Sequence, residues 1–337
     1  MIRPFATLID DYRIWYKITF QRGRILHTPD SSWEEFDRPA HYSDPRTFYG
    51  ANGVVPAVAT APVRSRTRAE VESFRHSSLH PIARDGYEAT DTSTGRFYWN
   101  AGRANAPVAI LCHGWAHEAV RPIEKLFVEP LLSAGFSVAL PSLPFHFERT
   151  PAGTYSGEMM VTGDVALTVE AFRQSAKDVC GLVSWLKAQG HETVGLVSYS
   201  LGGYVAGLAA CLRDDLDFVV IGAAGDSVVS VILDTRLGRN VRDDLSASGM
   251  HQREKLERAW GVISPGRLPL RVPRERVLLV AGRHDRIMLA SSVQRLWEGW
   301  GRPPIRWENE GHYSLLAVPG RLVRRARPLL AAFSREA

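Results

Sequence analysis

Short runs of consecutive apolar residues recur from residue 107 onward, and each run ends in glycine or in polar residues. Runs of this kind are typical of strands that are buried on both faces of a parallel sheet. Two earlier segments, residues 71–78 and 96–102, have the pattern of an antiparallel strand pair. The pattern therefore predicts a sheet whose main strands lie within residues 107–114, 136–144, 192–200, 218–226 and 276–285.

Helical patterns separate these predicted strands. The clearest one covers residues 164–189, where apolar residues recur at alternating steps of four and three and so share one helix face, which Gly190 ends. Residues 250–260 and 321–330 also predict helices. Because buried strands alternate with helices, we expect an α/β fold with a mostly parallel central sheet flanked by helices.

The chain divides into regions of different pattern. Residues 1–65 are rich in aromatic residues, proline and charge, and predict an N-terminal extension of short helices and loops. Residues 53–70 contain proline and small residues and predict the connection to the main domain, residues 66–337. Within that domain, residues 227–274 are longer than a strand connection needs and predict a small lid over a cleft.

Composition and charge narrow the class of protein. The formal net charge is +5, but the arginines are scattered among acidic residues, which argues against a nucleic-acid partner. No apolar run is long enough for a transmembrane segment. Asp10 and Asp11 interrupt the region where a signal peptide needs apolar residues, and Cys112, Cys180 and Cys211 show no zinc or disulfide spacing. We therefore expect a cytoplasmic protein with reduced thiols.

The candidate chemistry lies at the carboxyl ends of the predicted strands, where function gathers in such sheets. The sequence SYSLGG follows a strand and opens a helix. A nucleophile at the apex of so sharp a turn needs small residues two places before and two places after it. Ser200 has Ser198 and Gly202 there, whereas Ser198 would need Leu196 to be small. Ser200 is the candidate nucleophile, and a tight connection with incidental serines is the structural alternative.

A serine nucleophile needs a histidine base, which in turn needs a carboxylate. Asp285 ends the strand predicted at residues 276–285, and His312 follows another strand end. The order Ser200, Asp285, His312 is expected when the acid follows a late strand and the base follows the last one. Asp226 is the rival acid. Asp285 as a helix cap and His312 as a surface histidine are the structural alternatives.

Two backbone N–H groups are candidates for an oxyanion hole. Leu201 follows the nucleophile, and Trp115 lies in the loop after the strand at residues 107–114, which His113 and Gly114 shape. His113 and His117 straddle the strand end without a metal-binding motif, so we expect no metal ion.

Further residues near these strand ends are candidates for the substrate pocket. Some flank the predicted oxyanion loop or the nucleophile, and others follow the strand at residues 136–144. The candidates are His113, Gly114, Tyr199, His146 and Arg149.

The sequences HGW, SYSLGG, GRHD and EGH, in this order, resemble the α/β-hydrolase superfamily over residues 70–337. One departure is Ser198, which stands for the first glycine of the G-x-S-x-G pattern. The N-terminal extension and the sequence PSLPFHFERTPAGTYSGE look like a branch of predicted serine hydrolases. The resemblance implies the α/β-hydrolase fold and an esterase-like serine hydrolase.

The expected activity is hydrolysis of a small-molecule carboxylic ester by a Ser-His-Asp triad through an acyl-enzyme, without a cofactor. The same residues serve a thioesterase, an amidase, a carbon–carbon hydrolase or an acyltransferase, and the fold does not decide among them. A different class of protein is the other alternative: a non-catalytic binding or membrane-surface protein that retains the fold, suggested by the aromatic and basic residues 12–24.

Overall fold

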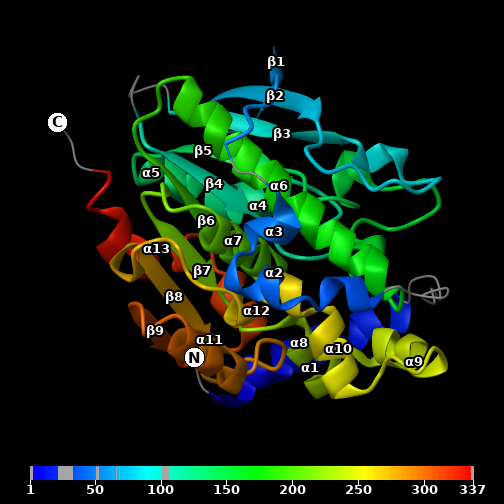
Figure 1. The fold of residues 1–337 in the computed structure, drawn as a ribbon. Coiled ribbons are helices and arrows are strands. Elements are labelled where there is room, and N and C mark those ends of the chain that lie inside the picture. The colour runs from blue at the N-terminus through cyan, green and yellow to red at the C-terminus, as the bar shows by residue number, and fades with distance from the viewer. Residues whose placement is uncertain are drawn as a thin grey trace.

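The computed structural model describes residues 3–21, 33–50, 53–65, 67, 69–100 and 106–334. Over these residues the chain forms a nine-stranded sheet in the order β1-β2-β3-β5-β4-β6-β7-β8-β9 (Figure 1). Three neighbouring pairs are antiparallel: β1–β2, β2–β3 and β3–β5. The other five pairs are parallel: β5–β4, β4–β6, β6–β7, β7–β8 and β8–β9. The strands are β1 (Ala59–Pro62), β2 (Glu70–Ser77), β3 (Thr92–Trp99), β4 (Val108–Cys112), β5 (Ser137–Pro141), β6 (Val194–Tyr199), β7 (Val219–Gly222), β8 (Val277–Gly282) and β9 (Ile305–Glu308). The predicted α/β fold and the predicted antiparallel pair, β2 and β3, are confirmed.

Strand β4 shows why both faces of the sheet carry helices. Successive side chains of a strand point to opposite faces. Val108, Ile110 and Cys112 face one apolar core, and Ala109 and Leu111 face the other. Helices α6 (Val165–Ala188) and α7 (Leu201–Leu212) cover the first core, while α5 (Glu129–Ser133) and α13 (Arg321–Leu330) cover the second.

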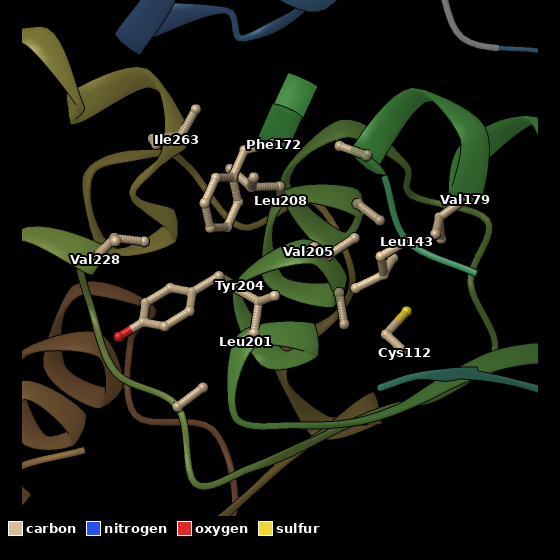
Figure 2. Close-up of a cluster of buried hydrophobic side chains, with 14 of the residues drawn as sticks. Cys112, Leu143, Phe172, Val179, Leu201, Tyr204, Val205, Leu208, Val228 and Ile263 are labelled. Atoms are coloured by element: carbon tan, nitrogen blue, oxygen red, sulfur yellow. The ribbon is translucent and has the colours of Figure 1, made fainter. Parts of the chain in front are cut away.

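The first core is dominated by contacts between α7 and α6. Figure 2 shows apolar side chains of α7, among them Val205 and Leu208, close to Phe172 of α6 and Cys112 of β4. The carboxylate of Asp164 caps α6 by accepting the Leu167 N–H at 2.9 Å. The helices predicted at residues 164–189 and 321–330 are therefore confirmed as α6 and α13.

The N-terminal region is tied to the main domain more closely than an appendage would be. It contains α1 (Arg3–Phe20), α2 (Pro39–Ser43) and α3 (Arg46–Tyr49), and its strand β1 extends the sheet by pairing with β2. Helix α1 has 18 residues, in contrast to the short helices expected there. Its periodicity is hidden because apolar residues on its solvent side, such as Leu8 and Tyr12, accompany the buried ones. Parts of the predicted extension, connection and strand at 96–102 lie outside the described residues, as do residues 22–24 of the aromatic, basic segment.

Residues 227–274 contain three α-helices, α8 (Val228–Asp234), α9 (Arg239–Ala247) and α10 (Arg253–Ala259), and α10 confirms the helix predicted within residues 250–260. This segment meets α1 directly, since Asn240 Nδ2 donates to the Ile18 carbonyl at 3.1 Å. Among the described residues, the remaining α-helices are α4 (Arg121–Ile123), α11 (Ala290–Gly299) and α12 (His312–Leu316). Within the described ranges, no helix has both the length and the apolar character that crossing a bilayer requires.

Candidate active site

The connection from β6 to α7 holds Ser200 in an unusual backbone conformation. Its φ of 54° and ψ of −126° lie where residues other than glycine are rarely found. Packing enforces the turn: a Cβ on Gly202 would lie 2.1 Å from the carbonyl oxygen of Cys112. Ser198, in contrast, is fully buried and donates its hydroxyl to the Val220 carbonyl at 2.8 Å. Of the two serines, Ser200 is the one whose side chain lines a cavity.

Asp285, His312 and Ser200 come together from three strand ends. His312 Nε2 lies 3.0 Å from Ser200 Oγ, and His312 Nδ1 lies 2.8 Å from Asp285 Oδ2. The other oxygen of Asp285 accepts the N–H groups of Ile287 at 2.8 Å and Met288 at 2.7 Å, which fixes the carboxylate. With Nδ1–H donating to Asp285, Nε2 is left to accept the serine proton. The geometry is that of a nucleophile, a base and an orienting acid.

The rival acid Asp226 lies in a different network. Its Oδ2 accepts from Arg295 Nε at 2.6 Å, its Oδ1 accepts from Arg295 Nη2 at 3.2 Å, and Ser292 also donates to it. His312 is bonded to Asp285 and not to Asp226.

The pKa of His312 reflects opposing effects. Burial lowers the pKa, but the charge and hydrogen bond of Asp285 raise it, and so does the charge of Asp10. The net pKa of His312 lies above its ordinary value of about 6.5. This imidazole is consequently a stronger base than a free one.

Asp10 is a residue of this site that the sequence analysis treated only as an interruption of a signal peptide. It is fully buried on α1. Its Oδ2 accepts the backbone N–H of His312 at 2.8 Å and of Arg286 at 3.2 Å, and its Oδ1 accepts the N–H of Tyr313 at 2.9 Å. One carboxylate therefore holds the backbone on both sides of the Asp285–His312 pair. The sequence carries only a weak indication of this role, since Asp10 is a single acidic residue on the same helix face as the apolar Ile14.

The two backbone N–H groups predicted to form an oxyanion hole lie at the start of α7 and in the loop after β4. The Leu201 N–H is the first of α7, and the first N–H groups of a helix have no intrahelical acceptor. Trp115 lies in the loop after β4. Next to it, the Ala116 N–H donates to His146 Nε2 at 3.3 Å, while His113 Nδ1 contacts the Gly114 carbonyl at 2.8 Å. These histidines hold the loop that carries Trp115.

Burial keeps His113 and His146 neutral. It lowers the pKa of His113 to about 4 and that of His146 well below the usual range. In the part of the chain that the structure describes, no three His, Cys, Asp or Glu side chains are placed to hold a metal ion.

A cavity of about 80 Å³ opens beside Ser200 and His312. Its walls are mainly apolar and come from α8 and α9 of the 227–274 segment, from α7 and from the Asp285 loop. Lys17 of α1, Trp115 and Tyr313 also line it. The apolar lining includes Val161, Leu201, Val228, Val231, Ile232 and Met288.

None of the five residues expected in the substrate pocket lines this cavity. His113 and Gly114 belong to the loop after β4, and His146, which follows β5, accepts from Ala116 of that loop. Tyr199 stacks on Phe127 with ring centroids 4.1 Å apart, on the other side of the sheet. Arg149 is buried, and its guanidinium donates to Asp178 of α6 at 3.0 Å and to backbone carbonyls. These side chains stabilise the walls behind the site rather than its opening.

Comparison with known proteins agrees with this fold. The family model "Alpha/beta hydrolase domain containing 18" matches residues 98–230. Acetyl xylan esterase 1 from Thermoanaerobacterium sp. JW/SL YS485 superposes with a TM-score of 0.65 over 93% of this chain and 96% of its own, at 16% identity. The chain has the α/β-hydrolase fold. A second α/β-hydrolase structure, the acetyl xylan esterase from Paenibacillus sp. R4, has a TM-score of 0.62 over 93% of this chain and 98% of its own, at 12% identity.

Two sequence relatives of this chain are uncharacterized proteins. The uncharacterized protein Rv2627c of Mycobacterium tuberculosis is 32% identical over 180 residues, which are 53% of this chain and 42% of that protein. The matched region thus spans less than half the length of that relative. The uncharacterized protein YdjC of Bacillus subtilis is 31% identical over 85 residues, 25% of this chain and 72% of its own.

Replacing Asp10 by asparagine tests its contacts. The Asp10→Asn variant loses the charge that raises the pKa of His312 and points an amide at backbone donors. We expect a lower His312 pKa in an NMR titration of the imidazole, and about 1–3 kcal/mol less free energy of unfolding in urea. Asp11→Asn is the matched control, because Asp11 lies 3.9 Å from the exposed Arg236 and such pairs contribute little. An unchanged His312 pKa in a folded Asp10→Asn protein would contradict the prediction.

Proposed function

We propose that this protein is a serine hydrolase that cleaves the carboxylic ester of a small molecule through an acyl-enzyme. One observation supports this proposal above the others: the hydrogen-bonded series from Asp285 through His312 to Ser200, at the edge of a cavity. A serine hydroxyl 3.0 Å from an imidazole nitrogen, with a carboxylate on the other nitrogen, has the arrangement that a serine nucleophile needs.

In the proposed reaction, Ser200 Oγ attacks the ester carbonyl carbon while His312 Nε2 takes its proton. Asp285 orients the ring and stabilises the imidazolium. The N–H groups of Leu201 and Trp115 bind the oxyanion, each contributing about 3 kcal/mol to transition-state stabilisation. His312 then protonates the departing alcohol. Water attacks the acyl-enzyme with His312 again as base, which releases the acid and restores Ser200 without a cofactor.

The size of the cavity favours a short acyl group. Its volume of about 80 Å³ is well below the roughly 300–1,000 Å³ of sites for drug-sized ligands.

Two proteins of similar structure are acetyl xylan esterases, which agrees with ester chemistry on this fold. At 16% and 12% identity that likeness extends to the fold, so the ester specificity of this chain is part of our proposal. In the same proposal, the 227–274 segment acts as a lid.

The nucleophile is tested by covalent labelling with a fluorophosphonate, followed by peptide mapping. We expect the label on Ser200, and we expect Ser200→Ala to lose both the label and roughly 10⁴-fold or more of esterase turnover. Ser198→Ala is the matched control, because Ser198 bonds to the Val220 carbonyl inside the sheet and should leave labelling intact. No label on folded wild-type protein would contradict the proposal and favour a binding protein that retains the fold.

The acid is tested by comparing two asparagine variants. Asp285→Asn should lower kcat by roughly 10³- to 10⁴-fold, because the amide favours the wrong tautomer of His312. Asp226→Asn should stay within a few-fold of wild type, although losing its bonds to Arg295 lowers thermal stability. The opposite order of the two kcat values would identify Asp226 as the acid.

The pH dependence follows from His312. Only neutral His312 accepts the serine proton, and its folded-state pKa is raised. As pH is lowered, kcat/KM should therefore already have fallen to half of its maximum at a pH above about 6.5. The sign for stability is opposite: a raised pKa stabilises the fold below about pH 6.5, and that contribution is lost as pH rises through the folded value. Measuring kcat/KM between pH 5 and 9 with a neutral ester tests this. An acidic midpoint near pH 5 would contradict it.

A further inference from the structure

Helix α1 contributes a positive charge to the cavity. Asp10, Ile14 and Lys17 follow one another at steps of four and three, so they share the face of α1 that packs toward the site. Lys17 lines the cavity together with Ser200. Its Nζ lies 4.9 Å from the centroid of the Trp115 ring and 3.2 Å from Gln21 Oε1. Helix α1 therefore binds the backbone at His312 through Asp10 and brings the ammonium group of Lys17 to the cavity beside Ser200.

This ammonium has no carboxylate partner within ion-pair distance among the residues that the structure describes. The two buried acids of the site bond elsewhere: Asp10 accepts backbone N–H groups, and Asp285 bonds to His312. A charge beside an apolar wall is costly unless an opposite charge or hydrogen bonds compensate it. The contacts of Lys17 are with a tryptophan ring and a neutral amide, so an anion in the cavity would supply the opposite charge that these contacts lack.

We propose that Lys17 binds an anionic group of the substrate, so that the preferred substrate is a short ester bearing a carboxylate or phosphate near the scissile bond. The inference rests on the proposed ester hydrolysis and adds a substrate class to it. Two features support it. The apolar walls fit the carbon atoms of a short chain, and Lys17 is a cation that lines the same cavity as the nucleophile. A point charge of this kind is a common ligand of carboxylates and phosphates.

The protonation of Lys17 supplies an independent readout. Burial and the charge of Arg13 lower its pKa to about 8, partly offset by Glu118, so it is mostly protonated at neutral pH. The groups that face Lys17 electrostatically come from several elements: Arg13 of α1, His117 and Glu118 after β4, His146, and His312 of α12. His117 and His146 are neutral because burial lowers their pKa values well below 7.

Matched pairs of esters test the inference. One pair varies the leaving group, 4-acetoxybenzoate against 4-acetoxybenzamide, and the other varies the acyl group, monomethyl glutarate against methyl pentanoate. We expect wild type to have a higher kcat/KM for the anionic member of at least one pair, which also tells on which side of the ester the anion lies. Lys17→Met should lower that kcat/KM by roughly 10- to 100-fold and change the neutral member less than about 3-fold.

Lys255→Met is the matched control, because Lys255 also lies over a tryptophan ring, 5.7 Å from the centroid of Trp33, but does not line the cavity. It should leave both members of each pair unchanged. The pH profile is the second test. The preference of wild type for the anionic ester should disappear as pH rises through about 8, whereas Lys17→Arg should keep the preference there because arginine stays charged.

The failure of this inference differs from the failure of the proposed function. Equal turnover of both members of each pair by a protein that is labelled at Ser200 would overturn the role of Lys17 and leave the serine hydrolase intact. Equal losses for both members in Lys17→Met would do the same. Absence of both labelling and turnover with every ester would overturn the serine hydrolase and this inference with it.

Discussion

The backbone at Ser200 is the constraint on which the candidate site depends. A φ of 54° is unfavourable for a residue with a Cβ, so the surrounding packing has to maintain it. Helix α7 lies so close to β4 that residue 202 has no space for a side chain, and a Cβ at Gly203 would lie 2.4 Å from Ala224 Cβ. The close approach directs the serine hydroxyl out of the sheet at the start of α7. Every other feature of the site is arranged around that hydroxyl.

The buried charges around His312 divide two tasks between two carboxylates. Asp285 bonds to the ring and fixes its tautomer, whereas Asp10 bonds to the backbone and fixes the position of the loop. Both raise the pKa of the imidazole. Because Asp10 and Lys17 lie on one face of α1, the N-terminal helix contacts both the backbone of His312 and the cavity beside Ser200. Residues before the main domain are thus part of the site's electrostatics.

Much of this arrangement could be predicted from local sequence. The β4 run and the α6 periodicity depend on neighbours within a few residues, and Ser200, Asp285 and His312 each follow a strand end, which the topology brings to one edge. Asp10 could not be predicted because its partners are 276 to 303 positions away. Arg149 was expected in the pocket because it follows a strand end, yet its side chain turns back to Asp178 of α6. The position of a residue in the sequence indicates where its backbone lies relative to a strand end, whereas the direction of a long side chain depends on the fold.

The bond between Asp10 and His312 joins residues 302 positions apart, which has a consequence for how the protein matures. Domains fold as synthesis proceeds from the N-terminus, and contacts of long sequence separation form late. Helix α1 therefore leaves the ribosome long before the N–H groups that its buried aspartate accepts. Until residues 311–313 emerge, a nascent chain contains Ser200 and α1 but neither His312 nor the N–H groups that Asp10 accepts. The contact of His312 with Ser200 and the anchoring of His312 by Asp10 therefore form in the same late step.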